Sequence, residues 1–325
     1  MSTLKVGGIR GVSASSDAIT VANDGTCTAN ATNIPLRNLF LNGALDVAQR
    51  GDSYSSANAY MADQWYVFAT GSTSSRLTTS PPDGFTHYIR FPSTSNSVIF
   101  SQQIELEAQG KVGKYKNKTV TVSWYARSES SNKMYVDAAF KNNSGGGDYT
   151  TIVSGSGSAQ DITSSWARYS QTFTISATPH ANNTCFSVMI RTPSSGSGST
   201  GTLEATGFQC EFGDTVTDFE HIAIAEDLSR CLRYFYKMPM NPNDTNHGAH
   251  PAYQYHPSYK MIVNDYPVIM RAIPTVTFTI GNPDATSSFN VFNISEKQFK
   301  AYKSSGYAAQ ESFYLRSFEA NAEFP

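Results

Sequence analysis

The sequence is poor in charge: only 15% of its 325 residues are Asp, Glu, Lys or Arg, and 39% are hydrophobic. Helical proteins carry Glu, Lys and Ala on their exposed faces, so this composition argues against a helical bundle. Serine, threonine, asparagine and glycine stand in place of the missing charge. The 18 tyrosines and 19 phenylalanines favour strands, because aromatic residues pack well on a pleated surface. We therefore expect a mainly β protein with many polar loops.

Other absences exclude whole classes of function. The net charge is −2 and no basic patch could neutralise phosphates, so we expect no nucleic-acid partner. No run of about 18 apolar residues could span a membrane, and the first residues lack the apolar core of a signal peptide. The four cysteines show no CxxC spacing, so we expect buried thiols rather than disulfides or zinc ligands. We expect a protein that is made in a cytosol and inserts into no membrane.

Hydrophobic periodicity divides the chain into three parts. Residues 1–37 form a polar, Gly-rich arm that is too thin to bury a core alone. We expect copies of the chain to order this arm in an oligomer, with a floppy terminus as the alternative. Residues 38–225 alternate apolar and polar positions between turn clusters, which predicts a β-sandwich of about eight or more strands. The expected strands are 38–42, 65–68, 87–91, 98–107, 119–127, 134–140, 167–175, 185–191 and 201–212.

The pattern changes to helical spacing at residue 226. Leu228, Cys231, Leu232 and Phe235 recur at i, i+3, i+4 and i+7 after two acidic residues, which predicts a helix over 226–237. The polar stretch 243–260 is typical of a loop. Strand patterns return at 266–270, 275–280, 289–294 and 314–320. We expect residues 226–325 to form a small C-terminal α+β domain.

Several motifs follow one another in a fixed order along the chain. They begin with NLFLNGALDVAQRG at 38–51 and ADQW at 62–65, and end with EDLSRCLRYF at 226–235. Between these lie SQQIE at 101–105, VTVSWYAR at 120–127, WARY at 166–169 and GFQCEFG at 207–213 with TDFE at 217–220. In this order they resemble phage tail-fibre proteins with a jelly-roll module of the carbohydrate-binding type. The arm motifs VGGI at 6–9 and SDAIT at 16–20 resemble fibre proteins of marine phages.

This resemblance implies a homotrimeric virion fibre, made in the host cytoplasm, whose arm joins other phage tail or virion proteins. It also implies contact with a glycan on the host cell surface. Jelly rolls of this type often hold a structural calcium ion where the first and last strands meet. By resemblance, Asp46 and Glu211 would supply oxygens there, although calcium takes about six or more of them, so simple surface charges are the alternative. No other cofactor is expected.

Enzymatic motifs are missing from the sequence. There is no nucleophile elbow, phosphate loop, H-E-x-x-H pair or zinc-type Cys/His set. His247, His250 and His256 cluster in a polar segment with no accompanying carboxylates, so exposed loop residues are expected there. A glycosidase needs two carboxyls across a cleft, and nothing in the sequence pairs Glu105 or Glu107 with a partner. We therefore expect no catalytic activity.

Sugar binding needs aromatic faces beside hydrogen-bonding side chains. Tryptophan is more often core than ligand platform, so we expect the three tryptophans to be buried. These are Trp65, Trp124 and Trp166. The candidate ligand-binding residues are Tyr66, Tyr125 and Tyr169, which lie close to them in sequence.

Three functions remain open on this sequence. The first is a non-catalytic fibre that recognises a host-surface glycan, and the second is a purely structural virion fibre or decoration protein. The third is a polysaccharide depolymerase. Phage depolymerases usually carry a long repetitive β-helix, for which these motifs leave no room, and this argues against the third function. The polar loops, the aromatic residues and the resemblance lead us to expect the first function.

Overall fold

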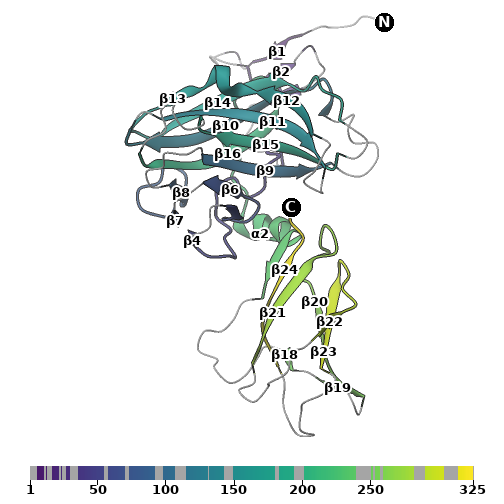
Figure 1. Ribbon diagram of the computed structural model, residues 1–325. Helices are drawn as coiled ribbons and strands as arrows, with labels where there is room; N and C mark the ends of the chain where they lie inside the picture. The colour runs from purple at the N-terminus through teal and green to yellow at the C-terminus, as the bar shows by residue number, and fades with distance from the viewer. Residues whose placement is uncertain are drawn as a thin grey trace, which may run out of the picture. The chain divides into compact units, whose positions relative to one another are not determined.

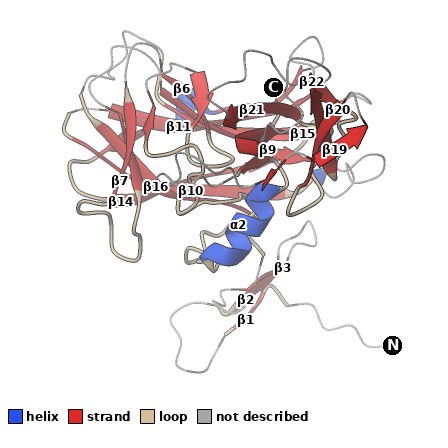
Figure 2. Ribbon diagram, turned by 90° about the horizontal axis from the view of Figure 1, so that it is seen from below, coloured by secondary structure: helices blue, strands red, loops and turns tan. Residues whose placement is uncertain are grey.

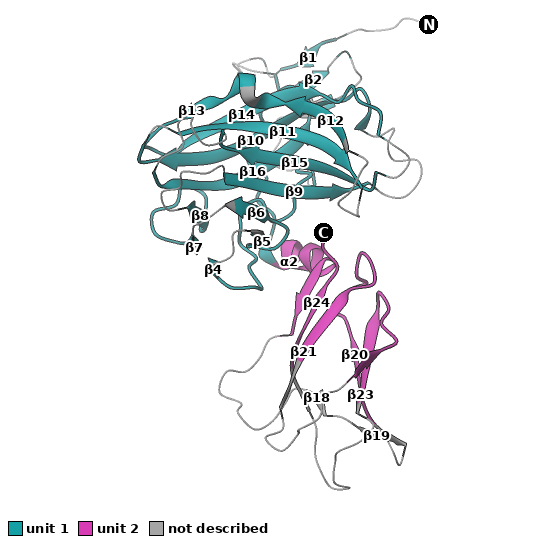
Figure 3. Cartoon of the chain, in the orientation of Figure 1, with its two compact units in different colours: residues 1–224, 325 teal, residues 225–324 magenta. Residues whose placement is uncertain are grey.

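The computed structural model divides into two compact units, Met1–Ile224 and Ala225–Phe324 (Figure 3). The sequence-based division placed the boundary after residue 225, with the arm as a separate part. The described residues are 6–10, 12, 17–21, 23, 27–29, 36–54, 58–69, 73–91, 98–106, 115–130, 132–142, 149–179, 183–193, 201–238, 250–251, 253–256, 259–281, 290–303 and 314–324.

Strands dominate the described residues of the first unit. The elements are β1 (Gly8–Ile9), β2 (Ile19–Val21), β3 (Cys27–Ala29), β4 (Ser53–Tyr54), β5 (Asn58–Tyr60), β6 (Tyr66–Ala69), β7 (Ser74–Leu77), β8 (Tyr88–Phe91), β9 (Val98–Glu105), β10 (Thr119–Ser128), β11 (Asn132–Lys141), β12 (Tyr149–Ser154), η1 (Gly155–Ser158), β13 (Gln160–Ile162), β14 (Ala167–Thr174), β15 (Cys185–Arg191) and β16 (Leu203–Phe212). The mainly β prediction is confirmed. In the arm, β1, β2 and β3 form a small antiparallel sheet (Figure 2). The ordering of this arm by other copies stays a prediction.

Two antiparallel sheets stack to form the sandwich (Figure 1). The six-stranded sheet has the order β14-β10-β16-β8-β7-β4, and the seven-stranded sheet has the order β12-β11-β15-β9-β6-β5 with β13 beside β11. Alternation decides which side chains lie between the sheets: in β10, Val120, Val122 and Trp124 point inward and are fully buried. The rings of Phe91 and Phe100 join the two sheets edge to face, with centroids 4.9 Å apart.

Residues 38–47 form no strand, and side-chain hydrogen bonds hold much of this segment. The side-chain Nδ2 of Asn42 donates to the backbone carbonyls of Val47 and Asp63, at 2.8 and 2.9 Å. The indole of Trp65 donates to the Asn42 carbonyl at 2.9 Å. Asn42 also has φ of 52°, a left-handed conformation that asparagine tolerates. The prediction of a strand over 38–42 is therefore wrong, because these polar contacts replace the ladder.

The second unit is also mostly strand. Its elements are α2 (Ile224–Leu232), which begins at the last residue of the first unit, then β17 (Phe235–Lys237), β18 (His250–Pro251), β19 (Tyr253–His256), β20 (Tyr259–Asp265), β21 (Thr275–Gly281), β22 (Asn290–Phe292), β23 (Gln298–Lys303) and β24 (Tyr314–Asn321). The strands form two four-stranded sheets. In one sheet β24 pairs with each of β17, β18 and β21, and the other has the order β19-β20-β23-β22. A second core, with Phe299 and Phe318 in edge-to-face contact, lies within this unit.

Four sequence predictions in the second unit need correction. The helix ends at Leu232, not at 237, because Phe235 pairs with Asn321 in the sheet and the Ala322 amide donates to the Tyr234 carbonyl at 2.7 Å. Leu228 is 37% exposed instead of facing the core. The stretch 243–260, predicted as loop, contains β18, β19 and the start of β20, whereas 266–270 is not a strand. No helix within the described residues is long and apolar enough to cross a membrane.

Candidate functional site

The outward face of the six-stranded sheet brings together charged residues that are far apart in sequence. Glu204 on β16 pairs in register with Arg90 on β8 and with Arg127 on β10. Their neighbours Ile89, Ala126 and Ala205 point into the core, so the three charged side chains share the outer face. Adjacent strands lie about 4.8 Å apart, which puts each guanidinium within reach of the carboxylate.

Glu204 is held by both arginines. Its side chain is 5% exposed; Arg90 Nε donates to Oε1 at 2.5 Å, and Arg127 Nε donates to Oε2. The hydrogen bond to Glu204 raises the pKa of Arg90 above its ordinary value. A nearly buried carboxylate is stable here because two cations compensate for its lost hydration.

Aromatic side chains support the two arginines from the sheet side. The guanidinium of Arg127 lies 4.9 Å from the ring centroid of Trp166 and 5.9 Å from that of Tyr88, while that of Arg90 lies 6.0 Å from Tyr88. The indole of Trp166 donates to the Ser80 carbonyl at 3.0 Å. Cation–π contacts of this kind fix the direction of each guanidinium.

A pocket of about 220 Å³ opens beside this cluster. Its wall consists of Arg90, Arg127, Ser128, Glu129, Ser164, Thr202 and Glu204. We call it the Arg–Glu pocket. Its wall is made of charged and hydroxyl-bearing side chains, which suits a small ligand rich in hydrogen-bonding groups.

An aromatic patch lies on the same outer face. Its members are Phe85, Tyr125, Phe219 and His221, and the ring of Phe85 has its centroid 4.8 to 5.3 Å from those of the other three. The guanidinium of Arg168, which pairs in register with Tyr125, lies 5.6 Å from the Tyr125 ring. We call Phe85, Tyr125, Phe219 and His221 the aromatic patch.

The three predicted ligand-binding tyrosines do not lie together. Tyr125 is half-buried in the aromatic patch, whereas Tyr66 is half-buried on the outer face of the seven-stranded sheet, 5.3 Å from the Tyr60 ring. Tyr169 is 9% exposed and belongs to the core, where it stacks on Trp124 and its hydroxyl accepts from the Thr163 amide. The expectation of a sugar-facing Tyr169 is therefore wrong, because its position in β14 points inward.

The tryptophan predictions hold for two of the three residues. Trp65 and Trp124 are fully buried in the sandwich core. Trp166 precedes β14, escapes the strand alternation and is only half-buried beneath Arg127. Sequence reasoning also missed the Arg–Glu pocket, whose members come from separate strands.

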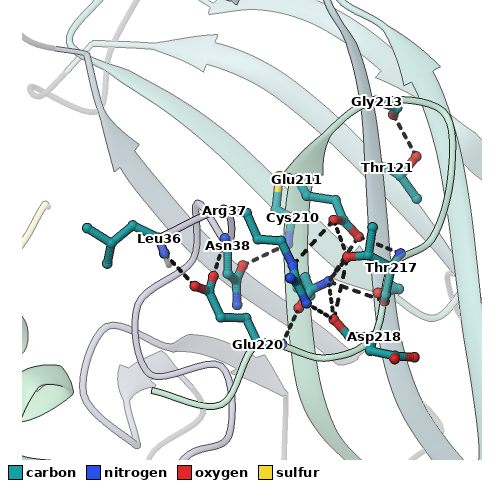
Figure 4. Close-up of polar contacts among 12 residues, drawn as sticks. Leu36, Arg37, Asn38, Thr121, Cys210, Glu211, Gly213, Thr217, Asp218 and Glu220 are labelled. Carbon is teal, nitrogen blue, oxygen red and sulfur yellow. Dashed lines mark hydrogen bonds and ion pairs between the residues drawn. The ribbon is translucent and has the colours of Figure 1, made fainter. Parts of the chain in front are cut away.

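Asp46 and Glu211 do not fit a shared calcium site. Figure 4 shows Glu211 beside Thr217 and Arg37. The Glu211 carboxylate accepts from Thr217 Oγ1 at 2.5 Å, from the Thr217 backbone amide at 3.1 Å and from Gln209 Nε2 at 2.9 Å, and Arg37 Nε lies 4.0 Å away. Asp46 contacts the ring of His87 at 2.6 Å instead. Calcium binds oxygen lone pairs, and the protein's own N–H and O–H groups already use those of Glu211. Hydrogen bonds within the protein therefore occupy the carboxylate of Glu211, where the first and last segments of the sandwich lie side by side.

The remaining titratable candidates show no common site. His247 and Glu107 lie outside the described residues, as do the side chains of His250 and His256. Glu105 lies on β9 opposite Cys185 of β15. Across the part of the chain that the structure describes, no group of three or more His, Cys, Asp or Glu side chains could hold a metal ion.

Comparison with known proteins locates one family signature. Residues 103–196 match the family model described as a carbohydrate binding domain. The match spans β10 to β15 and includes Tyr125, Arg127 and Trp166, while Arg90 and Glu204 lie on either side of it. This part of the sandwich is therefore similar to a carbohydrate binding domain. No curated protein matches the sequence.

Solved structures with similar arrangements are distant. The CBM22-1 xylan-binding domain of Xyn10C from Paenibacillus barcinonensis has 10% identity and a TM-score of 0.34, over 55% of this chain and 96% of that one. The module TmCBM61, solved with β-1,4-galactotriose, has 14% identity and a TM-score of 0.32, over 55% and 100%. The enzymatically active domain of tailspike protein 4 from bacteriophage CBA120 has 11% identity and a TM-score of 0.35, over 55% and 22%.

Proposed function

We propose that this chain is a non-catalytic, glycan-binding component of a phage virion fibre, and that the outer face of the six-stranded sheet meets the host-surface glycan. The observation that carries the proposal is the Arg–Glu pocket beside the aromatic patch on that face. Sugar recognition combines stacking on rings with hydrogen bonds to hydroxyls, and β10 presents one group of each kind, Tyr125 and Arg127, on this face. The family match over residues 103–196 supports a carbohydrate ligand.

The absence of catalysis is part of the proposal. A glycosidase needs a carboxylic acid that protonates the leaving oxygen and a second carboxyl across the bond. Glu204 is nearly buried, and both of its oxygens accept hydrogen bonds from arginine side chains. This carboxyl is therefore not positioned to protonate a glycosidic oxygen. Incubating the protein with host polysaccharide should leave the chain length unchanged, and shortening of the polymer would favour a depolymerase.

Whole-cell binding and a glycan array test the main claim. The purified chain should bind at least one host surface or glycan, and Tyr125→Ala should weaken that binding. Tyr66→Ala, on the opposite sheet, is the matched control and should bind like the wild type. Equal binding by both variants would move the site away from the aromatic patch, and a stronger loss in Tyr66→Ala would move it to the seven-stranded sheet.

The virion role has a separate test. A map of the particle with the fibre labelled should place the chain where it can reach the host surface. A buried collar position, together with no binding to any host glycan, would support the purely structural fibre or decoration protein instead.

A further inference from the structure

The Arg–Glu pocket has hydrogen-bonding capacity that its own contacts leave unused. A guanidinium carries five N–H groups, and the contact with Glu204 uses the Nε of Arg90 and of Arg127. The Nη2 of Arg90 also lies 3.5 Å from the Tyr88 hydroxyl, at the limit of a hydrogen bond. Further N–H groups of both side chains are therefore left for a ligand.

The charges that line the pocket balance. Arg90 and Arg127 are opposed by Glu129 and Glu204, and the rest of the wall is Ser128, Ser164 and Thr202. A carboxylate on the ligand would gain contacts with the arginines but would also face Glu129 and Glu204 in the same wall, which disfavours it. A neutral polyol can donate to the carboxylates and accept from the guanidinium groups without that repulsion.

The size of the pocket limits how much of a glycan enters. Its volume of about 220 Å³ is below the roughly 300–1,000 Å³ of sites for drug-sized ligands. One sugar ring is the matching unit, whereas several consecutive residues of a chain need a longer groove. The wall is also pre-organised, because Glu204 fixes both guanidinium groups and Trp166 and Tyr88 support them.

We infer that the Arg–Glu pocket binds a single uncharged sugar residue, at the end or at a branch of a glycan. Arg90 and Arg127 donate to its ring or hydroxyl oxygens, and Glu129 accepts from its hydroxyl groups. This inference rests on the proposed glycan-binding function and adds the class of the recognised unit.

Ligand-observed NMR on the full chain tests the class of sugar. The probes are a panel of neutral methyl hexosides and the methyl glycosides of the matching uronic acids. At least one neutral hexoside should bind, with its uronate binding about tenfold more weakly. Glu129→Gln should reduce the difference in affinity between the neutral hexoside and its uronate. A uronate that binds as well as or better than its neutral counterpart overturns the assignment to uncharged sugars.

A variant that blocks the Arg–Glu pocket tests whether the sugar binds there. Ser164 is an exposed residue of the pocket wall, so Ser164→Trp should fill the pocket, leave the Arg–Glu cluster intact and abolish hexoside binding. Ser165→Trp, at the next exposed position but outside the wall, is the matched control and should bind normally.

The outcomes separate this inference from the proposed function. If the wild type binds host polysaccharide and Ser164→Trp binds it equally well, the pocket assignment is wrong while glycan binding stands. If polysaccharide binds but no single hexoside does, the one-residue claim is wrong. If the wild type binds no glycan, both the inference and the proposed function fail.

Discussion

The three tryptophans occupy three different environments. Trp65 is buried and donates to the Asn42 carbonyl, and Trp166 is half-buried and donates to the Ser80 carbonyl. Trp124 is fully buried, and its indole nitrogen has no hydrogen-bond partner among the described residues. A buried donor without a partner costs about 1–3 kcal/mol, so Trp124 stabilises the core through its ring alone.

Substitutions at Trp124 should separate the ring from the indole nitrogen. Trp124→Ala should lower the free energy of unfolding by about 3–5 kcal/mol, because it leaves a cavity between the sheets. Trp124→Phe should cost much less, about 1 kcal/mol, since it keeps a ring and removes the unpaired donor. Urea unfolding followed by circular dichroism measures both. A Trp124→Phe variant as unstable as Trp124→Ala would mean that the indole nitrogen has a partner.

Asp63 should make stability depend on pH. Burial raises the pKa of this carboxyl above 3.8, while hydrogen bonds from the Gln49 side chain and amide lower it in part. A raised pKa means that the folded state binds the proton more tightly, so its stabilising contribution is complete below the unfolded pKa and is lost as pH rises through the folded pKa.

Thermal unfolding between about pH 4 and pH 7 tests this sign. Asp63→Asn cannot titrate, so its Tm should rise relative to the wild type as the pH increases across this window. A difference in Tm that stays constant with pH would show that Asp63 titrates normally in the folded protein.

At the scale of elements, an irregularity in β16 shapes the outer face. The register between β10 and β16 shifts between Ser123 and Tyr125, and Gly207 stands at this point with φ of +62°. The extra residue lets Phe208 enter the core while Thr206 keeps its place opposite Tyr125. A Cβ at Gly207 would lie 2.6 Å from Phe85 Cζ and 2.8 Å from Tyr125 Cδ2. The aromatic patch therefore needs glycine beneath it.

Gly207→Ala should destabilise the fold by about 1–3 kcal/mol and displace the rings of Phe85 and Tyr125, with weaker glycan binding as a result. Gly157→Ala is the control, because a Cβ there meets nothing within 4 Å. Chemical denaturation and the glycan array report the two effects. If Gly207→Ala matched Gly157→Ala in both, the close packing at this position would be refuted.

Long alternating strands and one member of the aromatic patch, Tyr125, could be predicted from the sequence, but the Arg–Glu pocket could not. The inward and outward sides of β10 follow from its alternation over nine residues, which holds because one face must be buried. The segment 38–42 misled, since the side chains of Asn38 and Asn42 supply hydrogen bonds that a strand would draw from a ladder. In the Arg–Glu pocket, Glu204 lies 114 positions from Arg90 and 77 positions from Arg127 in the sequence. Only the register of β8, β16 and β10 brings the three residues together.

At the scale of the whole molecule, the arm carries the prediction of assembly. We expect the full chain to sediment as three copies at micromolar concentration. A variant that lacks residues 1–35 should sediment as a monomer, because the arm cannot bury a core alone. Residues from Leu36 onward stay, since the Leu36 and Asn38 amides donate to Glu220 and fasten the sandwich. A full chain that sediments as a monomer would contradict this account of the arm.

We propose that a host glycan meets the sandwich on the outer face of the six-stranded sheet. A crystal structure of the full chain with a fragment of that glycan tests this most directly. We predict a single sugar ring within contact of Arg90, Arg127 and Glu129, with the next part of the glycan over the aromatic patch. Sugar bound over Tyr60 and Tyr66 on the seven-stranded sheet would contradict the account.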